Sequence, residues 1–208
     1  DLNLSNRVMT GVQLTRLIDG SKQRRYHLVN RAIKAGELLR LRSGLYLLDK
    51  SFRSHPIHPF ALAQAFVPGS YVSYETALAH HGWIPEAVYS TASATPERKS
   101  SKYENTIFGD FSFHPLATQP GCFLELVDRE LSNKQSMLVA SPIRALIDLV
   151  SLRKAEWHGM DWLTEGLRID YEHLQRVTRA DIQTLKLIYK QKRVNRFIDL
   201  LASELGND

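Results

Sequence analysis

Residues 21–34, SKQRRYHLVNRAIK, combine basic and amide side chains at a spacing suited to contact with a polyanion. On a helix, where successive residues are about 100° apart, the polar members of this segment gather on one side. They are Gln23, Arg24, His27, Asn30, Arg31 and Lys34. Arginine can form two parallel hydrogen bonds with guanine, and Asn or Gln can do the same with adenine. The segment therefore predicts a helix that reads base edges and contacts phosphates in the major groove of DNA.

The opposite side of this helix is predicted to be apolar and to face the protein interior. It holds Tyr26, Val29, Ala32 and Ile33. Arg25 falls toward the same side, so we expect its aliphatic stem to lie along the apolar surface or its guanidinium to pair with an acid. Ser21 is a typical N-cap for the helix, and Gly36 is a typical residue at its end.

Short elements flank the basic helix on both sides. Thr10 is a plausible N-cap for a preceding helix, which Asp19-Gly20 would end. After the basic helix, leucines at 39, 41, 45 and 47 fit two short strands, with Ser43-Gly44 forming a tight turn between them. Arg40 and Arg42 lie on this hairpin and are expected to reach a backbone phosphate beside the groove.

Taken together, these elements predict a winged helix-turn-helix DNA-binding domain over residues 1–50. Its predicted DNA contacts are Ser21, Lys22, Gln23, Arg24, His27, Asn30, Arg31, Lys34, Arg40 and Arg42. The alternative is a small helical domain with an ordinary hairpin, in which these arginines simply face water.

The charge distribution favours the DNA-binding interpretation. The chain has a net charge of +5. Residues 1–50 hold ten Lys and Arg against four Asp and Glu, a net +6, whereas the other 158 residues carry a net −1. A local excess of this kind is typical of a polyanion-binding module attached to a nearly neutral body.

Several other classes of protein are disfavoured by composition. No run of consecutive apolar residues approaches the length of a membrane-spanning segment, and the N-terminus lacks the charged-then-apolar pattern of an export signal. We therefore expect a cytoplasmic protein without a membrane partner. Cys122 is the only cysteine, which excludes an internal disulfide and a four-thiolate metal site.

A second domain is predicted over residues 58–208, after a linker at 51–58. Helices are expected at 58–66, at 73–82 with Ser73 as N-cap, and after Ser141-Pro142. Strands are expected at 88–94, 106–115 and 121–126, with a flexible basic connection at 96–103. The fold class is thus α+β: the winged helix-turn-helix followed by a mixed α/β domain with a helical C-terminus.

The helical C-terminal part is expected from Trp157 onward. Thr178 and Asp181 resemble a capping box for a helix whose apolar stripe contains Ile182, Leu185 and Ile188. A basic cluster follows, at Lys186, Lys190, Lys192, Arg193 and Arg196. These cations could contact phosphate or could favour the dipole at a helix C-terminus, and the sequence leaves both interpretations open.

Enzyme and metal sites find little support in the sequence. Neither Gly20-Ser21 nor Gly69-Ser70 is followed by the paired aspartates that a nucleotidyltransferase needs to hold magnesium. Glu97-Arg98-Lys99 matches only half of a nuclease motif. The closest histidine pairs, His55 with His58 and His80 with His81, have no carboxylate at ligand spacing. We therefore expect no enzyme activity, no cofactor and no metal.

Three segments resemble motifs of the AbiEi family of antitoxins. The first is GELLRLRSGLY at 36–46, the second is YVSYETALAHHG at 71–82, and the third is ASPIRALIDL at 140–149. They occur in the family's order and lie within residues 10–152. Thr76 stands where the family pattern has Ser.

This resemblance implies the antitoxin of a type IV toxin–antitoxin operon. Such a protein represses its own promoter by binding inverted repeats, and it counters a nucleotidyltransferase-like toxin without forming a stable complex with it. A monomer in solution is compatible with this role, and inverted repeats would favour cooperative binding of two copies to DNA. The alternative is a protein-interaction or RNA-binding module that uses the winged helix as a scaffold.

Overall fold

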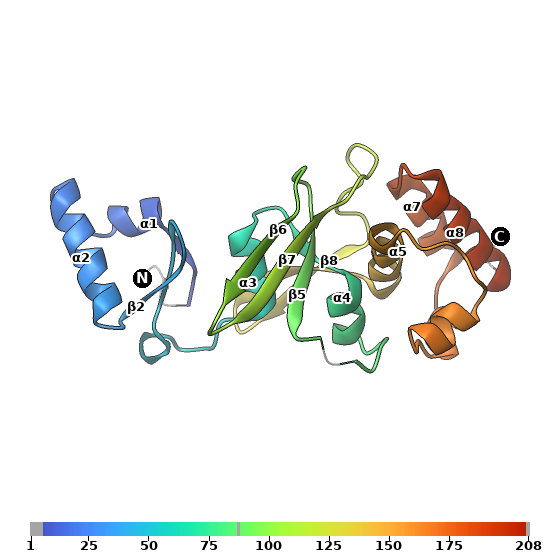
Figure 1. The fold of residues 1–208 in the computed structure, drawn as a ribbon, viewed down its shortest axis with the longest axis horizontal. Helices are drawn as coiled ribbons and strands as arrows, with labels where there is room; N and C mark the ends of the chain where they lie inside the picture. Colours follow the sequence, from blue (N-terminus) through green and yellow to red (C-terminus); the bar gives the residue numbers. More distant parts are fainter. Residues whose placement is uncertain (1–5, 87, 207–208) are drawn as a thin grey trace.

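The computed structural model describes residues 6–86 and 88–206. Within these residues, helices and strands alternate along the chain, and the strands form one sheet of three and one of six. Figure 1 shows an elongated molecule, with the N-terminal unit at one end, the larger sheet in the middle and the C-terminal helices at the other end. This mixture of helices and strands confirms the expected α+β character. No helix among the described residues has the length and apolar character needed to cross a membrane.

The N-terminal unit, residues 6–48, consists of two helices and a small antiparallel sheet. Helix α1 (Gly11–Arg16) and helix α2 (Lys22–Lys34) are followed by strands β2 (Leu38–Arg42) and β3 (Leu45–Leu48), and β1 (Met9–Thr10) pairs with β3. The predicted caps are confirmed: Thr10 and Gln13 form a capping box on α1, and the Ser21 hydroxyl accepts from the Arg24 amide at 3.3 Å. Gly44 forms the hairpin turn with a positive φ of 78°.

The hairpin also packs against the rest of the chain. Leu41, Leu45 and Leu47 are buried in the same hydrophobic cluster as Phe66 and Phe111 of the larger part. The expected boundary between residues 50 and 58 contains the 3-10 helix η1 (Lys50–Phe52), followed by a short segment with bends at 54 and 55 and no regular secondary structure. The N-terminal unit and the larger part therefore share apolar packing across the predicted linker.

The six-stranded sheet has the order β6-β7-β5-β4-β9-β8. Its strands are β4 (Tyr71–Val72), β5 (Ser90–Thr95), β6 (Ser101–Asn105), β7 (Gly109–Pro115), β8 (Val127–Ser132) and β9 (Gln135–Ala140). The pairs β4·β9 and β5·β7 are parallel, and the others are antiparallel. Helices α3 (Pro59–Phe66), α4 (Tyr74–His80) and α5 (Pro142–Arg153) pack against the sheet.

Some of the predicted elements are wrong. Part of the supposed flexible connection at 96–103 belongs to β6, which continues to Asn105 and pairs with β7. Residues 121–126 form turns instead of a strand, and the sequence reasoning missed the hairpin of β8 and β9 that follows. Asn133 and Lys134 connect these strands with φ values of 48° and 63°. Such values suit a two-residue hairpin turn, but a lysine in the second position obscures the usual sequence signal.

The C-terminal part is helical from residue 161. It contains the turn η2 (Trp162–Gly166) and helices α6 (Tyr171–Gln175), α7 (Arg179–Ile188) and α8 (Lys192–Glu204). The capping box of Thr178 and Asp181 and the burial of the predicted apolar stripe are confirmed. The helix-dipole explanation for the basic cluster is wrong for Lys192, Arg193 and Arg196, since these residues lie in the first turns of α8 and not at the end of α7.

A buried charged network joins β4, the start of α4, helix α5 and the end of α7. One oxygen of Asp148 accepts from the Tyr71 hydroxyl at 2.8 Å and from the Ser73 hydroxyl at 2.7 Å. Its other oxygen accepts from the Tyr189 hydroxyl at 2.7 Å and from Arg144 Nε at 2.9 Å. The expectation that the Ser73 side chain caps α4 is therefore wrong, because its hydroxyl donates to Asp148 instead.

The network is closed to solvent and saturated with hydrogen bonds. Arg144 and Asp148 are both fully buried, and the guanidinium also donates to the Glu125 carbonyl at 2.7 Å. Burial and the nearby Asp148 carboxylate raise the pKa of Tyr71 and Tyr189 well above the usual value, so both phenols stay protonated. Because every group has a partner and none is accessible, we interpret this network as a structural element.

Candidate nucleic-acid interface

Helix α2 presents the predicted polar face to solvent. Five of the six side chains on that face are exposed and Asn30 is half-buried. The exposed ones are Gln23, Arg24, His27, Arg31 and Lys34. Val29, Ala32 and Ile33 on the other side pack against the small core of Met9, Leu14 and Leu38. Figure 1 shows α2 at the outer end of the molecule, away from the six-stranded sheet.

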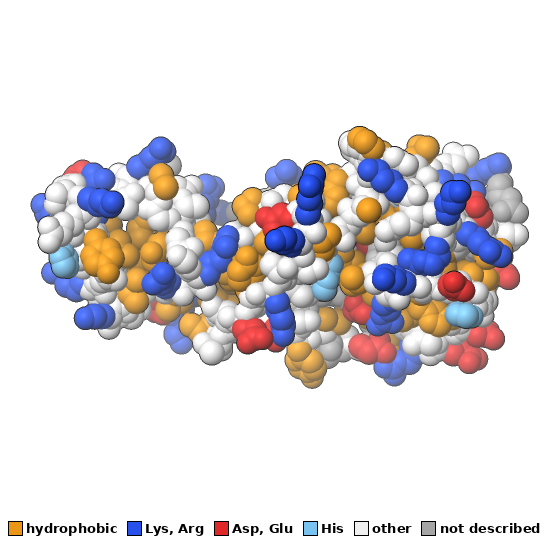
Figure 2. Space-filling view, turned by 45° about the horizontal axis from the view of Figure 1, so that its top comes forward, with side chains coloured by type: hydrophobic (Ala, Val, Ile, Leu, Met, Phe, Trp, Pro, Cys, Tyr) orange, Lys and Arg blue, Asp and Glu red, His pale blue; other side chains and the backbone are white. Residues whose placement is uncertain are grey.

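The charge of α2 is unusual for a helix with a purely structural role. Its first turn holds Lys22, Arg24 and Arg25 and no acidic residue, although the positive end of the helix dipole disfavours cations there. Within the described residues, none of the basic side chains of α2 forms an ion pair. Figure 2 shows Lys and Arg side chains spread over this end of the molecule. The helix is therefore an uncompensated cationic surface that suits a bound anion.

The turn before α2 brings the backbone of Gly20 close to the Arg24 side chain. Gly20 has a positive φ of 110°, and a Cβ added there would lie 2.8 Å from Arg24 Cδ. Ser21 uses its hydroxyl oxygen to cap α2, and both Ser21 and Lys22 are exposed. The two residues thus lie beside the first turn of the helix, where a phosphate can approach backbone amides.

The hairpin arginines have different environments. Arg40 is exposed, as a phosphate contact requires. Arg42 instead donates through Nη2 to the Phe66 carbonyl at 2.7 Å, and its guanidinium lies over the Tyr103 ring at 5.2 Å from the centroid. A register shift between Arg40 and Arg42 accompanies this change of direction. The expected phosphate contact of Arg42 therefore does not fit the structure, because the side chain binds the hairpin to the body.

Tyr26 also departs from the sequence prediction. It was expected on the apolar side of the basic helix, but its side chain is 67% exposed and its ring contacts His27 edge-on. It borders an open hollow lined also by Leu14, Val29 and Tyr46, so one side of its ring remains accessible to solvent. Tyr26 thus joins the exposed surface beside the predicted DNA contacts.

A largely apolar hollow, bordered by Arg31 and Glu37, lies beside α2. Its lining includes Leu14, Ile18, Leu28, Val29, Leu48 and Phe52. In this lining, the Phe52 side chain is 51% exposed. Leu17, which precedes Ile18 in the sequence, is 47% exposed. The N-terminal unit therefore has one polar, cationic surface and one apolar, partly open surface.

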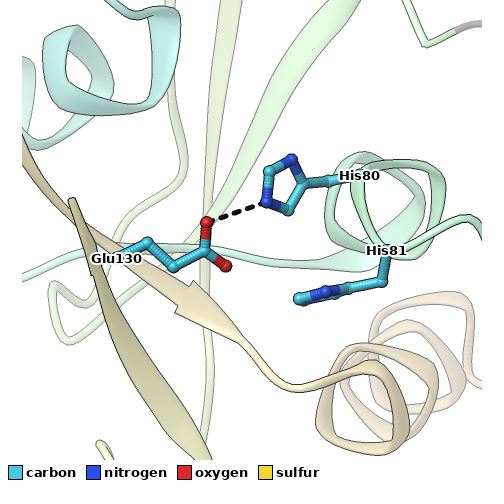
Figure 3. Close-up of side chains that lie close together, drawn as sticks. All are labelled: His80, His81 and Glu130. Carbon is cyan, nitrogen blue, oxygen red and sulfur yellow. Dashed lines mark hydrogen bonds and ion pairs between the residues drawn. The ribbon is translucent and has the colours of Figure 1, made fainter. Parts of the chain in front are cut away.

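The structure places a carboxylate beside one of the histidine pairs. Glu130 Oε2 lies 2.9 Å from His80 Nε2, with His81 next to both (Figure 3). Sequence reasoning missed Glu130 because it is 50 residues away on β8. The other pair is different, since the His58 ring accepts from the Phe60 amide and caps α3.

Comparison with protein-family models gave no match for this chain, and no curated protein sequence matches it.

Proposed function

We propose that this chain is a sequence-specific repressor that binds double-stranded DNA through a winged helix-turn-helix at its N-terminus. The observation that carries the proposal is the outward face of α2, where the exposed basic side chains form no ion pair with any described residue. Unpaired guanidinium and amide groups on a solvent-facing helix are what base recognition in a major groove requires.

In the proposed complex, α2 lies in the major groove. Arg24 and Arg31 contact base edges, while Lys34 and Arg40 contact phosphates. Ser21 and Lys22, at the start of α2, lie next to a phosphate of the groove wall. Arg42 is left out of this interface because it is bonded to Phe66 and Tyr103.

The biological role that we propose is that of a type IV antitoxin which represses its own operon. Three motifs that resemble the AbiEi family support it, and each overlaps observed elements of the fold: the hairpin of β2 and β3, the strand β4 with helix α4, and the helix α5 that carries the buried network. The proposed partners are inverted repeats in the promoter, bound cooperatively, and a nucleotidyltransferase-like toxin that forms no stable complex with the chain. We propose no catalytic activity for this protein.

The test is to measure the affinity of the full chain for labelled promoter DNA by fluorescence anisotropy at increasing salt concentrations. Six or more phosphate contacts would reduce affinity by about three orders of magnitude between about 50 and 200 mM salt. Arg24→Ala and Arg31→Ala should each cost roughly 1–3 kcal/mol and weaken sequence preference. Arg176→Ala is the matched control, because Arg176 is an exposed arginine outside the N-terminal unit. Equal binding of promoter and unrelated DNA by the wild type would contradict the proposal.

The second candidate is a protein-interaction or RNA-binding module, and the apolar hollow beside α2 favours its protein-binding form. Open surfaces lined by leucine, isoleucine and phenylalanine are typical of sites that receive a partner's apolar side chains. The same anisotropy experiment distinguishes the two candidates. A protein-binding module would show no preference for promoter DNA over unrelated DNA. In such a module, Phe52→Ser would abolish binding of the partner protein.

A further inference from the structure

We propose that His80, His81 and Glu130 form a binding site for a divalent first-row transition metal ion, of which Zn²⁺ is the best match. One ligand atom from each residue can be chosen so that all three lie within 4.8 Å of one another. The site lies in the body of the protein and is independent of the proposed DNA interface.

Two of the three ligand atoms are already in contact. His80 Nε2 and Glu130 Oε2 are 2.9 Å apart, and both side chains are about one-third exposed, at 31% and 29%. In a tetrahedral zinc site, ligand atoms about 2.0–2.1 Å from the metal are separated by about 3.3 Å. The first pair would have to open by a few tenths of an ångström, and small side-chain rotations would bring in the third ligand. Solvent exposure gives the ion a path to the site.

The hydrogen bond of His81 leaves its other ring nitrogen free to bind a metal. Its Nε2 lies 2.9 Å from the Ala140 carbonyl oxygen, which can only accept, so Nε2 carries the proton and donates. The neutral ring then keeps an unprotonated Nδ1 as an electron-pair donor. Histidines that bind metals usually donate their other N–H to a carbonyl or carboxylate in this way. Figure 3 shows the His81 ring extending from the end of α4 toward the region beside Glu130.

The backbone around the site also favours a cation. His80 is the last residue of α4 and His81 is its C-cap, so both lie where the helix dipole is negative. Gly82 follows with a φ of 70° and ends the helix. The His80 ring packs edge-on against Phe60, with the ring centroids 5.1 Å apart, which limits its rotation. The site is thus partly ordered before any ion binds.

The ligand set indicates the chemical class of the ion. Two imidazoles and one carboxylate suit Zn²⁺ and neighbouring transition metals, whereas Mg²⁺ and Ca²⁺ prefer ligands that are all oxygen. Three protein ligands leave a fourth position for water. The bound ion would connect the end of α4 to β8, which lies at the edge of the six-stranded sheet. It would therefore stabilise the folded chain against unfolding.

The test is titration of the untagged, chelator-treated full chain with Zn²⁺ by isothermal calorimetry. We expect the titration to give one ion per chain. In thermal unfolding followed by circular dichroism, we expect a melting temperature that rises with Zn²⁺ concentration. His80→Gln and Glu130→Gln should each weaken Zn²⁺ binding at least about ten-fold. His158→Gln is the matched control, because His158 is an exposed histidine outside the cluster, and its affinity should equal that of the wild type.

Both ligand variants should fold, since each removes one partner of a solvent-accessible pair, and circular dichroism checks this directly. Two results would overturn the proposal. One is the absence of Zn²⁺ binding to the wild type in the micromolar range. The other is equal Zn²⁺ affinity of the wild type, His80→Gln and Glu130→Gln, which would place the bound ion elsewhere.

Discussion

Arg40 and Arg42 are two residues apart on β2, and the structure predicts opposite consequences for their removal. Arg42 donates a charged hydrogen bond to the Phe66 carbonyl, worth about 1.5–3 kcal/mol. Its contact with the Tyr103 ring adds about 0.5–1 kcal/mol. The Arg42 Nε is buried without a partner, which offsets about 1 kcal/mol. Arg42→Ala should therefore lower the free energy of unfolding by about 2 kcal/mol.

Urea denaturation measures this effect directly. With a slope of about 2 kcal/mol per M, the unfolding midpoint of Arg42→Ala should fall by about 1 M. The Arg40 side chain is exposed and has no hydrogen-bond or ion-pair partner among the described residues, so Arg40→Ala should change the free energy of unfolding by no more than about 0.5 kcal/mol. For DNA binding, we expect the larger effect from Arg40→Ala and the smaller one from Arg42→Ala. Arg40→Ala should reduce the slope of affinity against salt by about one phosphate contact, and Arg42→Ala should not change it.

The opposite behaviour of Arg42 would contradict its assignment to the body of the protein. If Arg42→Ala kept full stability but lost one phosphate contact from the salt dependence, the side chain would have to leave Phe66 and turn toward DNA. The hairpin would then act as sequence reasoning first predicted.

Three further predictions concern the buried network, the turn before α2 and pH. Asp148→Ala leaves a buried guanidinium and three hydroxyls without their acceptor and should cost about 3–5 kcal/mol, while Ser73→Ala should cost only about 1 kcal/mol in the same urea titration. Gly20→Ala should cost about 1–2 kcal/mol and weaken promoter binding, because the new Cβ strains the backbone and displaces Arg24; unchanged binding would remove Arg24 from the interface. Burial lowers the pKa of the His114 imidazole, so the folded state disfavours its protonation. The resulting contribution to stability is fully present above the unfolded pKa of about 6.5, and it is lost as the pH falls through the lower pKa of the folded state. His114→Gln should therefore show a smaller loss of stability than the wild type between neutral and mildly acidic pH, and an identical pH profile would contradict this assignment.

Local patterns predicted the N-terminal helices well. The caps at Thr10 and Ser21 depend only on residues within one turn, and the polar face of α2 follows from helical geometry. The same holds for the capping box at Thr178. These features could be derived from sequence because both interacting groups lie within a few positions of each other.

Features that depend on distant residues could not be derived in this way. β6 is polar and alternates weakly, and its strand character comes from pairing with β7. Arg42 resembles Arg40 in sequence, but its partner Phe66 is 24 positions away. Glu130 joins His80 only because β8 lies beside the end of α4. In each case, tertiary packing decides which group a side chain meets.

The most direct test of the central claim is a photo-crosslinking measurement on promoter DNA. A photoreactive amino acid at His27, on the outward face of α2, should crosslink efficiently to the promoter. The same group at Leu187, which is 68% exposed on α7, should not. Crosslinking from Leu187 alone, or from neither position under conditions where the protein binds the promoter, would contradict the assignment of α2 as the recognition helix.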